Sequence, residues 1–160
     1  MTISPNFAYT PAPGIATIST NNASRDGTGT LTTIYTVPST YTFTPSPVFS
    51  ASGGAWVSPT ATVSNVVTSG WRCDRVRAKA TGTTVVGALI LYLHNGTTAF
   101  PIAEVQITAV TPTAGTTDAW ERVIEFPGGL NLPPGWSLRA SYTTAQSGTA
   151  FTVLAEGGLC

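Results

Sequence analysis

Hydrophobic and polar residues alternate along much of the chain with a period of two, and the alternating stretches are short. The clearest is RCDRVRAKA at residues 72–80, where the cations Arg75, Arg77 and Lys79 share one face and small apolar residues occupy the positions between them. Such alternation is typical of a strand with one solvated face. We find no helical period. Similar alternating stretches predict further principal strands at residues 29–37, 118–126, 136–142 and 149–156.

A β-hairpin is predicted around the Asn95-Gly96 pair, which lies between two apolar runs. An Asn-Gly pair favours a two-residue type I′ turn, because that turn needs positive φ at both central positions. The run before it, residues 85–93, is far shorter than the ~20 residues that span a bilayer, so it predicts a central strand. His94, the only histidine of the chain, and Thr97 would then flank the turn at the exposed hairpin tip.

About eight principal strands with turn residues between them predict an all-β fold, specifically an antiparallel β-sandwich of the jelly-roll type. We assign one such domain to residues 25–160. Within it, residues 38–70 contain short apolar segments separated by proline and glycine, which indicates an excursion with short strands. Residues 1–24 show no sustained period and are expected to form an extended N-terminal arm. Its apolar side chains are candidates for binding a partner, namely Phe7, Tyr9, Ile15 and Ile18.

The composition favours a protein that works by assembly. Only 9% of the 160 residues are charged and the formal net charge is zero, so nothing draws the chain toward nucleic acid or an anionic membrane. The N-terminal sequence lacks a signal peptide, so we expect synthesis in a cytoplasm without secretion. Cys73 and Cys160 do not amount to a disulfide framework and are expected to be free thiols.

Catalytic, cofactor-binding and metal-binding residues are not expected anywhere in the sequence. A cupin-like metal site needs several imidazoles, and His94 supplies one. A glycosidase needs two suitably placed carboxylates, for which Asp118, Glu121 and Glu125 are the candidates. Alternation around Arg122 instead indicates a solvated strand face. We therefore expect neither enzymatic activity nor a cofactor.

The charged residues predict an intramolecular ladder. If the strand ending at Val37 is lettered B and the excursion contributes C, then residues 72–80 are D and residues 118–126 are G. The jelly-roll sheets B-I-D-G and C-H-E-F place D beside G. Opposite charges across such a pair contribute roughly 0.2–1 kcal/mol each. The alternative is a basic patch that awaits a partner. The residues of the candidate ladder are Arg75, Arg77, Lys79, Glu121 and Glu125.

Four motifs in order carry a resemblance to a known family: RDGTGTLTTIYT, DRVRAKATGTT, LYLHNGTTAFPIAEVQITAVTPT and LPPGWSLRAS. Together they resemble small β-sandwich proteins encoded among the virion genes of tailed bacteriophages and prophages, some of them capsid decoration or cement proteins. The resemblance covers residues 25–36 and 72–156 and implies no catalytic residue.

A decoration protein is expected on the capsid surface of the virion. Its partners would be the major capsid protein and copies of itself in a dimer or trimer, with no direct contact to nucleic acid or a membrane. The alternative is a tail or fibre-tip module that binds a host glycan or another virion protein. In that case one or two exposed tryptophans would stack on sugar rings; the candidates are Trp56, Trp71, Trp120 and Trp136.

Overall fold

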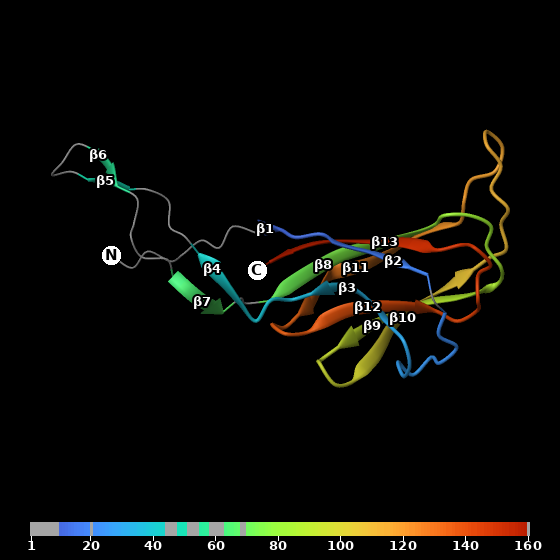
Figure 1. Cartoon of the computed structure of the whole chain (residues 1–160), viewed down its shortest axis with the longest axis horizontal. Helices are drawn as coiled ribbons and strands as arrows, with labels where there is room; N and C mark the ends of the chain where they lie inside the picture. The colour runs from blue at the N-terminus through green and yellow to red at the C-terminus, as the bar shows by residue number, and fades with distance from the viewer. Residues whose placement is uncertain are drawn as a thin grey trace.

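The computed structural model describes residues 10–19, 21–43, 48–50, 55–57, 63–67 and 70–159, and all regular secondary structure among them is β-strand (Figure 1). Eight principal strands form two antiparallel sheets, which confirms the all-β sandwich. The strands are β1 (Thr10–Pro11), β2 (Gly14–Ile18), β3 (Thr32–Thr36), β4 (Thr40–Phe43), β5 (Val48–Ser50), β6 (Ala55–Val57), β7 (Val63–Val67), β8 (Trp71–Ala80), β9 (Gly87–His94), β10 (Ala99–Ile107), β11 (Glu121–Leu132), β12 (Ser137–Tyr142) and β13 (Phe151–Leu159).

The two sheets have the orders β2-β13-β8-β11 and β3-β12-β9-β10, and β1 also pairs with β13. When β2 is lettered B, these orders read B-I-D-G and C-H-E-F. Strand β8 therefore lies beside β11, as the ladder hypothesis requires. Strands B and C are β2 and β3. The expectation that B is the strand ending at Val37 and that the excursion contributes C is therefore wrong. The excursion adds no described strand to either sheet.

The expectation of an extended arm over residues 1–24 is wrong for the segment that forms β2. This strand pairs with β13 from Phe151↔Ile18 to Ala155↔Gly14, which satisfies the free side of β13. Ile18 is fully buried in the core and is therefore not available to a partner. Ile15 points the other way and is 67% exposed.

Gly14 explains how closely β2 approaches the opposite sheet. A Cβ atom at this position would lie 2.8 Å from the Ile34 carbonyl oxygen and 2.8 Å from the Tyr35 Cβ atom. Only glycine allows that approach without displacing β3. Phe7 and Tyr9, the other two candidate residues of the arm, lie outside the described residues.

The core lies between the sheets and is rich in aromatic residues. Trp71 and Trp120 are buried in it, whereas Trp136 is only partly buried, and the Trp56 side chain lies outside the described part. Cys73 is a buried free thiol whose pKa is raised to about 12, first by burial and then by the charge of Asp74. The largest fully buried side chains of this core are Trp71, Tyr142, Phe151, Ile18, Leu89, Leu91, Ile107, Leu132 and Leu138.

The β9–β10 hairpin forms as expected, but its turn is longer than two residues. His94 pairs with Ala99, so four residues, 95–98, connect the strands. The Asn95 side chain accepts hydrogen bonds from the backbone N–H groups of Thr97 and Thr98, at 3.0 and 2.7 Å. These bonds stabilise the longer turn in place of the type I′ pair.

Residues 38–70 contain two further two-stranded sheets, β4 with β7 and β5 with β6. Figure 1 shows β4 and β7 past the end of the sandwich, along its long axis. Short strands in an excursion were expected from the sequence. The described strands of the excursion therefore pair only with one another and join neither main sheet.

Candidate interaction surface

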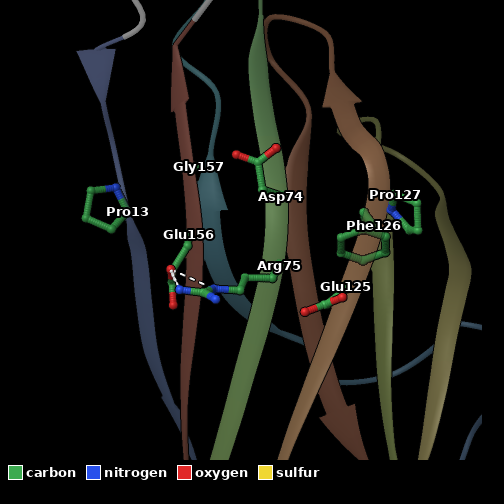
Figure 2. A pocket seen from close by; sticks show the side chains of 8 residues that line it. All are labelled: Pro13, Asp74, Arg75, Glu125, Phe126, Pro127, Glu156 and Gly157. Atoms are coloured by element: carbon green, nitrogen blue, oxygen red, sulfur yellow. Dashed lines mark hydrogen bonds and ion pairs between the residues drawn. The ribbon is translucent and has the colours of Figure 1, made fainter.

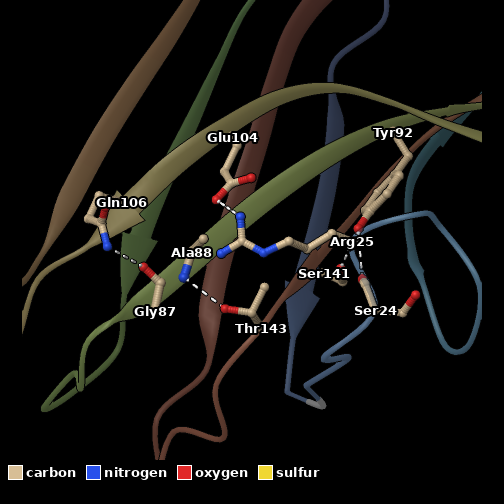
Figure 3. A network of polar contacts seen from close by, with 9 residues as sticks. All are labelled: Ser24, Arg25, Gly87, Ala88, Tyr92, Glu104, Gln106, Ser141 and Thr143. Carbon is tan, nitrogen blue, oxygen red and sulfur yellow. Dashed lines mark hydrogen bonds and ion pairs between the residues drawn. The ribbon is translucent and has the colours of Figure 1, made fainter.

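The second sheet is covered on its outer face by the loop of residues 21–31. Beneath this loop, Ala88, Ile90 and Tyr92 are buried and pack with Leu31 in a small second core. The Tyr92 hydroxyl donates to the Ser24 carbonyl oxygen at 3.3 Å and accepts from the Ser141 hydroxyl, also at 3.3 Å (Figure 3).

An ion pair further fixes the loop over the sheet. Arg25 Nη1 lies 2.5 Å from Glu104 Oε1, and this pair joins the loop to β10 (Figure 3). Tyr92, Arg25 and Glu104 therefore attach the loop at two points. On this face the loop therefore covers Ala88, Ile90 and Tyr92.

Asp26 organises the same loop from within. Its carboxylate accepts hydrogen bonds from the Ser24 hydroxyl, from the Thr28 backbone N–H at 2.9 Å and from the Thr28 hydroxyl at 2.7 Å. These bonds, first of all the one from Ser24, hold the pKa of Asp26 at about 2, below its ordinary value of 3.8. Two hydroxyls, those of Ser24 and Thr28, thus serve one carboxylate.

Replacing Asp26 by asparagine is expected to loosen residues 22–30, because the uncharged amide is a weaker acceptor for these donors. In the wild type the carboxylate bonds are complete above pH 3.8 and are lost as the pH falls toward about 2, since the folded pKa lies below the ordinary one. Amide hydrogen exchange of residues 22–30 measures both effects. The control is Asp118→Asn, an exposed aspartate outside the loop. Equal exchange in the two variants would contradict this role.

The outer face of the first sheet is exposed instead, and we call its outward-pointing residues the open face. They form three rows that run across the strands in the printed register of the pairs. The middle row combines apolar side chains with one arginine, and the residues at its two ends, Ile15 and Val123, are 67% and 44% exposed. The rows are Thr17-Thr152-Lys79-Glu121, then Ile15-Leu154-Arg77-Val123, then Glu156-Arg75-Glu125.

The candidate charge ladder lies on the open face, with one change of partner. Glu121 lies between two cations, since Arg77 Nε and Lys79 Nζ are each 3.6 Å from its carboxylate oxygens. Arg75 binds Glu156 of β13, with Nη2 2.6 Å from Oε2, and not Glu125. The pKa of Glu156 is accordingly lowered, mainly by its hydrogen bond from Arg75.

The expected Arg75–Glu125 contact is absent because β8 is a central strand with an acid on each side. Arg75 lies opposite Glu156 in one direction and Glu125 in the other, and its single guanidinium forms its contacts with Glu156. Glu125 forms no ion pair with any described residue. The exposed pairs of the ladder contribute about 0–1 kcal/mol each to stability. The Glu125 carboxylate is thus the one acid of the three rows without an ion-pair contact to a described residue, although its charge, after the hydrogen bond to Glu156, also helps to raise the pKa of Arg75.

A hollow of about 670 Å³ opens at one end of the open face (Figure 2). It exists because β11 bulges: Glu125 pairs with Arg75 and Leu130 with Cys73, so residues 126–129 stand opposite Asp74 alone. Gly128 and Gly129 supply the positive φ angles of 85° and 79° that this bulge needs.

The hollow has apolar sides and a charged floor. Phe126 and Pro127 of the bulge line one side and Pro13 lines the other, while Asp74, Arg75 and Glu156 lie between them (Figure 2). No group of three histidine, cysteine, aspartate or glutamate side chains suited to a metal ion occurs in the described part of the chain. From the sequence, FPGG indicated the end of a strand and not a bulge.

His94 lies at the end of β9, next to the hairpin turn. Its Nδ1 atom accepts a hydrogen bond from the Gly96 backbone N–H at 3.0 Å. Partial desolvation, followed by the charge of Arg139, lowers the pKa of His94. The imidazole therefore has a local role in the turn.

Comparisons of the chain with protein-family models, with curated proteins and with solved structures gave no match in any of the three. The described residues include no helix of the length and apolarity that a membrane crossing requires. The interpretation of function thus depends on the surfaces of the sandwich.

Proposed function

We propose that this chain is a structural protein of a tailed-bacteriophage particle, namely a decoration or cement protein with a jelly-roll sandwich that binds and stabilises the head shell. The observation that carries the proposal is the open face. It offers an exposed surface of mixed apolar and charged character, which suits adhesion to another protein. The order of the four sequence motifs and the low charge of the chain support the same assignment.

Many copies of a weak contact would stabilise a shell. If each subunit bridges neighbouring capsid proteins, the shell resists internal pressure through the sum of these contacts, although each one alone is modest. In this proposal the partners are the major capsid protein and other copies of the chain. The capsid surface of the virion is its location.

The copy number per particle tests this function. Particles would be purified from the phage or prophage that encodes the chain and analysed by quantitative mass spectrometry with isotope-labelled peptides. A head protein is expected in the order of hundreds of copies, because it repeats with the capsid lattice. A value near a dozen or fewer would place the chain in the tail, and its absence from particles would contradict both assignments.

A second candidate function is a tail module that binds a host glycan, and one aromatic pair favours it. Phe100 is 43% exposed and stacks on the partly buried Trp136, with ring centroids 6.3 Å apart and planes at 17°. Sugar rings stack on exposed aromatic faces of this kind. Of the tryptophans whose side chains are described, Trp71 and Trp120 are buried and are therefore excluded from such a role.

A further inference from the structure

We infer that the open face binds the open face of a second copy of this chain, so that the protein forms a two-fold symmetric dimer. This inference concerns the purified protein and does not depend on binding to a capsid; on a particle, the capsid protein would compete with the second copy for the same face. It follows from three features of the first sheet: its uncovered outer face, the arrangement of its charges, and the hollow beside the bulge of β11.

The uncovered face differs from the rest of the sandwich. The opposite sheet has its own covering loop, residues 21–31, whereas the open face leaves Ile15 and Val123 exposed at the two ends of one row. The three rows of the open face carry three cations and three anions, so together they have no net charge and no preference for a polyanion. A partner with a matching alternation of both signs fits it best.

A second copy has that alternation in the required order. Consider a two-fold axis parallel to the strands, above the space between β8 and β11. It places β8 of one copy over β11 of the other and keeps each residue at its height along the strand. The register then sets Lys79 opposite Glu121 of the second copy. It also sets Arg75 opposite Glu125 of the second copy, and that carboxylate forms no ion pair with the described residues of its own chain.

The middle row adds an apolar contact at the centre of the same arrangement. Arg77 lies opposite Val123 in the register, so the aliphatic part of each arginine would cover the exposed valine of the other copy. Each contact occurs twice because of the symmetry. One two-fold axis therefore accounts for both the charged contacts of the outer rows and the apolar contact of the middle row.

The shape of the surface fits the same two-fold axis. The bulge that carries Phe126 and Pro127 belongs to β11, and the floor of the hollow includes Asp74 and Arg75 of β8. Placing β11 over β8 of the second copy brings each bulge toward the hollow of the other. Because the open face is only four strands wide, we expect a dimer that dissociates on dilution.

Charge reversal with complementation tests the inference. Sedimentation velocity of the full-length protein at low salt is expected to show a concentration-dependent species of twice 16.5 kDa. Glu121→Lys and Lys79→Glu should each weaken self-association by about tenfold or more, since each reversal brings like charges together twice. An equimolar mixture of these two variants should associate again, because both contacts between unlike copies are then attractive. Circular dichroism verifies that each variant is folded.

The matched control is Arg122→Glu, an exposed charge reversal one residue from Glu121 in β11 whose side chain does not belong to the open face. It should leave self-association unchanged within about twofold. A wild-type protein that stays monomeric up to millimolar concentration overturns the inference. So does a trimer, an equal effect of the control, or a mixture of Glu121→Lys and Lys79→Glu that remains monomeric.

Discussion

Replacing Trp71 by alanine is expected to lower the free energy of unfolding by about 3–5 kcal/mol. The side chain is fully buried at the first position of β8. Its ring stacks on Tyr35 of β3 with centroids 4.5 Å apart, and its indole N–H donates to the Ala12 carbonyl oxygen at 2.8 Å. One side chain thus connects both sheets with the chain segment before β2. Urea unfolding followed by circular dichroism measures the loss.

Trp71→Phe is the control for the packing part of this effect. Phenylalanine keeps an aromatic ring against Tyr35 but leaves the Ala12 carbonyl without its donor, so we expect a smaller loss of about 1–3 kcal/mol. A loss below about 1 kcal/mol for Trp71→Ala would contradict the central position of this tryptophan, because a cavity of that size is costly in a packed core.

Strands that alternate strictly could be predicted from the sequence almost to the residue. The prediction for residues 72–80 corresponds to β8 (Trp71–Ala80), because one face of this strand meets the core and the other meets solvent. The apolar run of residues 85–93 corresponds to β9, whose middle residues are buried by the core on one side and by the loop of residues 21–31 on the other. A continuous apolar run is typical of a strand covered on both faces.

The identity of strand β2 could not be predicted, because it depends on a partner at the opposite end of the chain. Its five residues GIATI are too few to establish a period, and prolines precede them. What makes them a strand is the free side of β13. Such long-range pairing leaves no local signal in the sequence.

The candidate site was predictable in its charges but not in its shape. Alternation placed Arg77 and Lys79 on one face and the strand order brought them to Glu121, yet it could not decide which of two flanking acids Arg75 binds. The hollow depends on the four-residue bulge in β11. Proline and two glycines there are equally consistent with the end of a strand.

Replacing Ile18 by alanine is expected to lower the free energy of unfolding by about 2–5 kcal/mol, because its buried side chain would leave a cavity between the sheets. The same substitution at Ile15, three residues earlier in β2 and 67% exposed, should change it by no more than about 0.5 kcal/mol. The two variants remove the same atoms from opposite faces of one strand. The difference between them therefore isolates burial from β-propensity.

Chemical denaturation of both variants decides whether residues 14–18 are a strand of the sandwich or an arm that a partner orders. An arm contributes nothing to the folded monomer, so both substitutions would then leave the free energy of unfolding unchanged. The strand requires a large loss at Ile18 alone. Equal losses at the two positions would contradict the register that pairs Ile18 with Phe151 and Ile15 with Leu154, since that register sends the two side chains to opposite faces.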